Sequence, residues 1–228
     1  MILTGGAARR FGGGDKPGAL VGGRSLVERV AAAVAAAGRL VVVGERRELA
    51  RPGTIFTRED PPEGGPVPAV RAGVVHCHAD WVALLAGDLP FFTATDVERL
   101  LTAAAGQARD ALVDESGPAR AVLVDDGGPA GDVPVGDGGR SGDVPVGDGG
   151  SAGAVLVDDT GREQWLAGVW RRWVLVEALG RYDGRSLHGL LAPLGPAKVD
   201  AGADGRTPWF DCDTPADLAL ANQQEETR

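Results

Sequence analysis

The segment from Leu3 to Lys16 contains the residue types that a phosphate-binding loop needs. It holds glycines at 5–6 and 12–14 and the cations Arg10 and Lys16. Glycines let the backbone approach a polyphosphate closely, and their N–H groups can form a nest that binds anions. We expect Arg10 to bind the β- and γ-phosphates of a nucleotide and Lys16 to bind the α-phosphate under attack. Transfer of a phosphoryl-type group depends mainly on such positioning and charge neutralisation.

Other glycine-rich motifs describe this segment less well. It has neither the Gly-Lys-Ser/Thr sequence of a P-loop nor the G-x-G-x-x-G fingerprint of dinucleotide-binding proteins. On glycine content alone, a plain glycine-rich turn is an equal alternative. The two cations, placed after a short strand, favour the phosphate-binding interpretation.

Two acidic motifs further along the chain could complete such a site. Asp88 follows an apolar run at 81–85, and a carboxylate at the end of a strand is well placed to hold Mg²⁺ against triphosphate oxygens. Asp211 and Asp213 lie two residues apart, so on an extended segment both side chains share one face. Asp213 is therefore a candidate second metal ligand. The alternative for each motif is a turn or helix cap, and Thr214 serves as a cap in either case.

Several other polar residues are interpreted as structural or solvated. His76, Cys77 and His78 fall on a helix predicted over 67–78, where neighbouring side chains diverge by about 100° and cannot share one ion. Three arginines are interpreted as solvated side chains: Arg9, Arg46 and Arg47.

Short apolar runs alternate with longer Ala/Leu-rich segments, as in βαβ units. Strands are expected at 2–3, 40–43, 54–57 and 81–85, and helices at 25–37, 67–78 and 96–105. A hairpin of 154–157 and 164–169, short helices at 173–179 and 186–191 and a last helix capped by Thr214 follow. The pattern predicts an α/β fold: a three-layer, Rossmann-like domain whose mostly parallel sheet has helices on both faces. Ligands bind such folds at the carboxyl ends of the strands.

Residues 125–153 form a repeat rich in glycine, aspartate and proline. Gly131–Gly139 recurs as Gly142–Gly150, and the surrounding Ala121–Asp126 recurs as Ala154–Asp159. Such a composition buries too little apolar area to offset the entropy of ordering it. We therefore predict a loop inserted into a single domain that spans 1–228; a calcium-binding β-helix would need more repeats.

Composition and charge exclude several classes of partner. The chain has 228 residues and a net charge of −9, with no basic stripe for nucleic acid. No run reaches the roughly 20 apolar residues of a membrane span, and the N-terminus lacks the pattern of a secretory signal. Two cysteines are too few for a disulfide framework, so we expect a cytoplasmic protein.

Taken together, these motifs resemble those of the molybdenum cofactor guanylyltransferases. Leu3–Lys16 matches the family opening L-[AT]-G-G-x-x-x-R-[MF]-G-x-x-x-K. The similarity continues through Asp60 before Gly65-Pro66-Val67, Asp88 in the G-D-x-P position, Gln164–Val169 and Asp211–Leu218.

The resemblance implies transfer of GMP from GTP to the phosphate of a molybdopterin-type acceptor, with Mg²⁺ as cofactor and pyrophosphate as product. The enzyme would act as a monomer or in transient complexes with cofactor-biosynthesis or molybdoenzyme proteins. By position, the nucleotide-binding residues would be Leu3, Thr4, Gly5, Gly6, Lys16, Asp60 and Asp88. The motifs and the resemblance together give Arg10, Lys16 and Asp88 as catalytic candidates and Asp88 and Asp213 as metal ligands.

Departures from the family pattern keep two alternatives open. Gly44-Glu45 stands where relatives often have an asparagine for the base, and Asp211 and Asp213 stand where they often have asparagines. One alternative is a sibling nucleotidyltransferase that uses CTP or another phosphorylated acceptor. The other is a nucleotide-binding protein without catalysis, which would bind a triphosphate and release no pyrophosphate.

Overall fold

The structure is a computed structural model that describes residues 1–5, 11, 15–114, 151–200 and 205–227. The residues described form a seven-stranded sheet in the order β5-β4-β1-β6-β8-β7-β9. Strand β8 is antiparallel to both of its neighbours, and the other pairs in this sheet are parallel. The strands are β1 (Ile2–Leu3), β4 (Val41–Val43), β5 (Ile55–Thr57), β6 (Trp81–Ala86), β7 (Gly153–Val157), β8 (Glu163–Arg171) and β9 (Ala197–Asp200).

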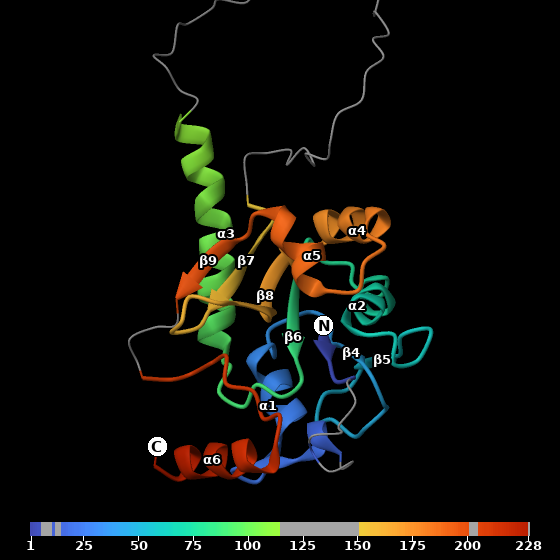
Figure 1. Ribbon diagram of the computed structural model, residues 1–228, viewed down its shortest axis with the longest axis vertical. Coiled ribbons are helices and arrows are strands. Elements are labelled where there is room, and N and C mark those ends of the chain that lie inside the picture. Colours follow the sequence, from blue (N-terminus) through green and yellow to red (C-terminus); the bar gives the residue numbers. More distant parts are fainter. Residues whose placement is uncertain (6–10, 12–14, 115–150, 201–204, 228) are drawn as a thin grey trace, which may run out of the picture.

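Helices cover both faces of this sheet, which confirms the predicted three-layer α/β fold (Figure 1). One face packs against α1 (Leu26–Ala33) and α3 (Ala94–Asp114). The other packs against α2 (Pro66–Val74), α4 (Arg172–Arg181) and α5 (Leu187–Leu191). Short 3₁₀ turns form at η2 (Lys16–Gly18) and η3 (Ala192–Leu194).

The layers follow from the alternation of side chains along each strand. Ile2 and Val42 point into the cluster that contains α1 and α3, whereas Leu3, Val41 and Val43 point into the cluster on the opposite face. Because β1 and β4 lie inside the sheet, they are apolar on both sides. This is why these strands read as continuous apolar runs in the sequence.

A smaller third cluster joins the C-terminal part of the chain to the rest of the domain. It contains Val21, Leu26, Phe91, Cys212 and Ala221. These residues connect the hairpin β2 (Leu20–Val21) and β3 (Arg24–Ser25), the segment after β6, and α6 (Pro215–Glu226). In Figure 1, α6 lies beside α1 and away from the other helices. None of the helices in the described ranges is long and apolar enough to cross a membrane.

Several element boundaries differ from those predicted. Helix α1 ends at Ala33 and not at residue 37, although its predicted capping box between Ser25 and Glu28 is present. Helix α2 ends at Val74, because the N–H groups of His76 and Cys77 bond three residues back, as in a turn. His76 and Cys77 therefore lie beyond the helix that was predicted to contain them. In contrast, α3 extends beyond its predicted range of 96–105 at both ends.

The boundary of the predicted insert is also different. Gly153 was assigned to the loop, but it is the first residue of β7. A Cβ at this position would lie 2.3 Å from the carbonyl oxygen of Val169 and 2.8 Å from Cε3 of Trp170. Glycine is thus used here for close approach between β7 and β8. The recurring segments Gly131–Gly139 and Gly142–Gly150 lie outside the described residues, which begin again at residue 151.

Candidate active site

Three neighbouring strands of the sheet end at the same level. The register pairs Leu3 with Val43 on one side and with Ala86 on the other. The chain beyond each strand is held in place by its neighbours: the N–H of Thr4 donates to Val43 O at 2.9 Å, and that of Gly87 donates to Leu3 O at 2.9 Å. The segments that follow β1, β4 and β6 therefore converge at one edge of the sheet, where this class of fold binds ligands.

The ammonium group of Lys16 lies between two carboxylates from distant parts of the chain. Its Nζ is 2.5 Å from Oδ2 of Asp88 and 2.5 Å from Oδ1 of Asp213. Burial disfavours the charged amine, but the pKa of Lys16 is raised because the two carboxylates outweigh that effect. The structure thus brings together three residues that the sequence singled out separately.

Asp88 lies immediately beyond β6, and its position depends on the glycine before it. A Cβ on Gly87 would lie 2.7 Å from Cγ2 of Thr4, so a larger residue would push β6 away from β1. The second carboxylate oxygen of Asp88, Oδ1, is buried and has no hydrogen-bond partner among the described residues. A buried carboxylate oxygen of this kind is costly unless a ligand satisfies it.

Asp213 reaches Lys16 because the segment that carries it is bonded to the Asp88 backbone. The N–H of Cys212 donates to Asp88 O at 3.2 Å, and the thiol of Cys212 is fully buried. Burial and the nearby Asp88 raise the pKa of this thiol to about 12, which excludes a thiolate nucleophile at neutral pH. Asp211 also has a raised pKa, through desolvation and the carboxylates of Asp213 and Asp88.

The beginning of the glycine-rich loop is fixed by contacts with the end of β4. The hydroxyl of Thr4 donates to Val43 O at 3.1 Å. Gly44 has a φ of +148°, and a Cβ there would lie 2.1 Å from Oγ1 of Thr4. The backbone beyond β4 therefore requires a glycine. Gly5, the next loop residue, is exposed and lies beside the carboxylate of Glu59.

These groups line an open cavity of about 1160 Å³. Its walls come from the ends of β1, β4 and β6, from the beginning of α2, and from β8 and the 209–213 segment. The predicted site residues among them are Leu3, Thr4, Gly5, Lys16, Asp88 and Asp213. Gly6 and Arg10 lie outside the described residues, so their proposed roles stay predictions. Asp60 is exposed and is not among the described residues of the wall, which include its neighbour Glu59.

Arg47, which was predicted to be solvated, lines the cavity. Its side chain is mostly buried, and its Nη1 lies 3.0 Å from Oδ1 of Asp15. Arg46, in contrast, is exposed and stacks over the ring of Phe56 at 5.6 Å. One signal for Arg47 was available, because it follows β4 at the edge where ligands bind.

The carboxylates suit a metal ion that is completed by its substrate. Within the described part of the chain, no group of three or more His, Cys, Asp and Glu side chains is placed to hold a metal ion. Mg²⁺ is usually held by one or two carboxylates together with substrate phosphates and water. Asp88 and Asp213, with the unpartnered Oδ1 of Asp88, fit that pattern.

Comparison with known protein families assigns the chain to one of them. A model described as the MobA-like NTP transferase domain matches residues 1–198. The chain belongs to this family. The match covers the glycine-rich opening, Asp88 and every strand except the last residues of β9, and it confirms the resemblance predicted from the sequence.

Two curated proteins are similar to part of this chain. The chain is 32% identical over 114 residues to a probable molybdenum cofactor guanylyltransferase of Haloferax mediterranei, covering 46% of this chain and 54% of that protein. It is 35% identical over 102 residues to a protein of the same name from Deinococcus radiodurans, covering 45% of this chain and 52% of that one. The aligned regions thus span about half the length of these curated relatives.

Solved structures share the fold at lower identity. A nucleotidyl transferase from Methanothermobacter thermautotroptrophicus has a TM-score of 0.64 and 15% identity, covering 100% of this chain and 97% of that one. A molybdopterin-guanine dinucleotide biosynthesis protein A from Archaeoglobus fulgidus has a TM-score of 0.59 and 16% identity, covering 100% and 98%. At such identities the likeness shows the fold alone.

Proposed function

We propose that the chain is a nucleotidyltransferase that transfers GMP from GTP to the terminal phosphate of a molybdopterin-type acceptor. An oxygen of the acceptor phosphate attacks the α-phosphorus of GTP, the bond between the α-phosphorus and its bridging oxygen breaks, and pyrophosphate leaves. The observation that carries the proposal is the placement of Lys16 between Asp88 and Asp213 at the ligand-binding edge of the sheet. The choice of guanine and of the acceptor rests on the names of relatives.

Some residues at this edge would bind the phosphates of the nucleotide, and others would hold a metal ion. Lys16 would turn from the carboxylates to the α-phosphate when a nucleotide enters, and Arg10 would bind the β- and γ-phosphates. Asp88 and Asp213 would then hold Mg²⁺, the proposed cofactor, with the buried Oδ1 of Asp88 as a ligand atom. When bound, Mg²⁺ neutralises negative charge on the triphosphate. Charges that are already in place when the bond breaks favour the transition state, because they need no reorganisation at that moment.

The nucleoside would lie against the loop that begins at Thr4 and against the chain beyond β4. Leu3, Thr4 and Gly5 line this part of the cavity, together with Glu45 and Glu59. The opposite wall, which includes Gln164 and Trp165 of β8, would face the acceptor. We extend the proposal to a cytoplasmic protein that acts as a monomer or in transient complexes with enzymes that make or use the cofactor.

The test measures magnesium-dependent release of pyrophosphate from GTP, CTP, ATP and UTP, with and without molybdenum-loaded molybdopterin. Release from GTP that requires the acceptor is the expected result. A preference for CTP would assign the chain to a cytidylyl branch. The fold is compatible with that outcome, since a solved cytidylyltransferase from Thermus thermophilus shares it with a TM-score of 0.59 and 18% identity, covering 99% of this chain and 97% of that one. Binding of GTP without pyrophosphate release under any of these conditions would contradict the proposed catalysis.

A further inference from the structure

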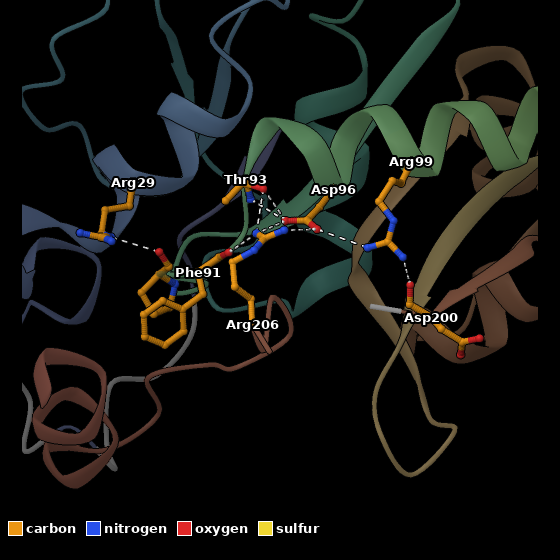
Figure 2. Close-up of polar contacts among 8 residues, drawn as sticks. Arg29, Phe91, Thr93, Asp96, Arg99, Asp200 and Arg206 are labelled. Atoms are coloured by element: carbon orange, nitrogen blue, oxygen red, sulfur yellow. Dashed lines mark hydrogen bonds and ion pairs between the residues drawn. The ribbon is translucent and has the colours of Figure 1, made fainter. Parts of the chain in front are cut away.

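A fully buried carboxylate anchors the segment of chain that leads to Asp213. Asp96, in the first turn of α3, is 0% exposed. Its Oδ2 lies 3.0 Å from Nη1 of Arg206, and its Oδ1 lies 3.4 Å from Nη2 of the same guanidinium (Figure 2). The two residues are 110 positions apart in the sequence. The pairing is bidentate, so it fixes the orientation of the guanidinium as well as its distance from the carboxylate.

The same guanidinium binds the loop that leads from Asp88 to α3. Nη1 of Arg206 donates to Phe91 O at 3.3 Å and to Oγ1 of Thr93 at 2.9 Å. Thr93 in turn donates its N–H and its hydroxyl to Oδ2 of Asp96, at 2.9 Å and 2.7 Å. Arg206 is thus bonded to the end of the Asp88 loop and to the helix that follows it.

Further contacts hold the Asp88 loop and the Arg206–Asp213 segment together along their length. The ring centroids of Phe91 and Phe210 are 5.8 Å apart. Beyond them, the N–H of Cys212 donates to Asp88 O at 3.2 Å. Arg206 joins the two segments at one end, through its bonds to Phe91 and Thr93. Lys16 joins them at the other end, through its contacts with Asp88 and Asp213.

A second arginine holds the loop from its other side. Nε of Arg29, on α1, donates to Pro90 O at 3.0 Å, and its Nη2 pairs with Glu225 at 2.8 Å. The Asp88 loop therefore has fixed supports on α1 and α3. The Asp213 segment, by contrast, reaches α3 through Arg206.

We propose that Arg206 is a positioning residue for the metal-binding carboxylates, and that its pairing with Asp96 sets the placement of Asp213 relative to Asp88. This inference rests on the proposed function, in which these two carboxylates hold a divalent cation. A functional constellation must be held within about 0.5 Å of its working geometry by the residues around it. A buried ion pair contributes little net stability compared with an apolar pair, whereas the two hydrogen bonds of a bidentate guanidinium add geometric specificity. Arg206 contacts neither carboxylate of the site in the contacts described, so it acts through the segment.

The experiment compares Arg206→Gln with Arg99→Gln. Arg99 is the matched control, because its Nη1 also lies 3.8 Å from Oδ1 of Asp96 while its Nη2 bonds to Asp200 O at the end of β9 (Figure 2). Mn²⁺ binding is titrated by electron paramagnetic resonance with GTP present and no acceptor, and thermal unfolding is recorded for each protein. Loss of a side chain that hydrogen-bonds a metal ligand typically weakens metal binding by about 10- to 100-fold. Because Arg206 acts through the segment, we expect a loss at the lower end of that range, about tenfold, for Arg206→Gln, and less than about a twofold change for Arg99→Gln.

The double variant Asp96→Asn/Arg206→Gln replaces the single variant if Arg206→Gln does not fold. It removes the buried carboxylate of Asp96 together with its partner, so no buried charge is left without compensation. It should lose Mn²⁺ binding to the same extent. Mn²⁺ binding equal to wild type in either Arg206 variant, or an equal loss in Arg99→Gln, would overturn the positioning role. Absence of Mn²⁺ binding in the wild-type protein with GTP would instead overturn the proposed metal site, and the inference with it.

Discussion

The backbone N–H of Cys212 donates a hydrogen bond of 3.2 Å to the carbonyl oxygen of Asp88. This bond joins two segments that are more than 120 residues apart, and on either side of it a carboxylate reaches the same ammonium group, that of Lys16. Because the bond uses main-chain atoms, it does not depend on the side chains at 88 and 212. It holds Asp88 and Asp213 side by side, at the end of the paired segments opposite Arg206.

Loss of the Lys16 charge should affect turnover and metal binding in opposite directions. Its ammonium group lies at 2.5 Å from both Asp88 and Asp213, where a divalent cation would compete with it. Lys16→Met should lower turnover by about 100-fold or more, as loss of a charge-stabilising group typically does. The same variant should bind Mn²⁺ more tightly than wild type when no nucleotide is present, since the ammonium group no longer competes for the two carboxylates.

The control for this variant is Lys198→Met, which removes the other lysine of the chain. Lys198 is 61% exposed and pairs with Glu163. It should leave Mn²⁺ binding without nucleotide unchanged. Weaker or equal Mn²⁺ binding by Lys16→Met would show that the ammonium group does not compete with the cation.

Gly44 should be required for nucleotide binding and not only for folding. Gly44 and Gly53 both have positive φ, at +148° and +77°, and alanine at either position costs about 1–3 kcal/mol of stability through backbone strain. A Cβ at Gly44 would also lie 2.1 Å from Oγ1 of Thr4, whereas nothing lies within 4 Å of one at Gly53. Gly44→Ala should therefore raise the KM for GTP, and Gly53→Ala should not. Equal KM values for the two variants, measured below their melting temperatures, would contradict a role for Thr4 in the site.

Local patterns in the sequence predicted much of this fold and part of the site. The Ser25–Glu28 capping box and the Thr214 cap depend on residues three apart, and both are present. Asp88 could be placed because a strand end fixes its edge of the sheet. The pairing of Arg206 with Asp96 could not be predicted, since it depends on how two distant segments pack. Arg47 was assigned to solvent although its position just beyond β4 was a signal for the site; the burial of its side chain depends on Asp15 and the cavity wall, which the sequence does not place.

The turn between β7 and β8 should show a pH-dependent stability that comes from Asp158. Its Oδ1 accepts from the hydroxyl of Thr160 at 2.6 Å and from the N–H groups of Thr160 and Arg162 at 2.9 Å and 3.0 Å. These bonds, led by that of the Thr160 hydroxyl, lower the pKa of Asp158 below its ordinary value of 3.8. A lowered pKa in the folded state stabilises the protein above the unfolded-state pKa, and that contribution disappears as the pH falls through the folded-state value.

Asp158→Asn should therefore lower the urea midpoint at neutral pH, and the difference from wild type should shrink as the pH drops below 3.8. The neighbouring Asp159→Asn is the matched control and should change the urea midpoint at neutral pH less than Asp158→Asn does. A difference for Asp158→Asn that stays constant across the pH range would show that the loss comes from geometry and not from the charge.

Arg47 should contribute to nucleotide binding, in contrast to its neighbour Arg46. Arg47 lines the cavity and lies 3.0 Å from Asp15, the residue before Lys16, so it both adds positive charge to the site and holds the start of η2. Arg47→Gln should raise the KM for GTP by about tenfold, the scale of one charged hydrogen bond. Arg46→Gln removes the same charge from an exposed side chain over Phe56 and should change the KM by less than about twofold. Steady-state kinetics at fixed Mg²⁺ would separate the two, and equal effects would mean that net charge, rather than the contact with Asp15, sets the affinity.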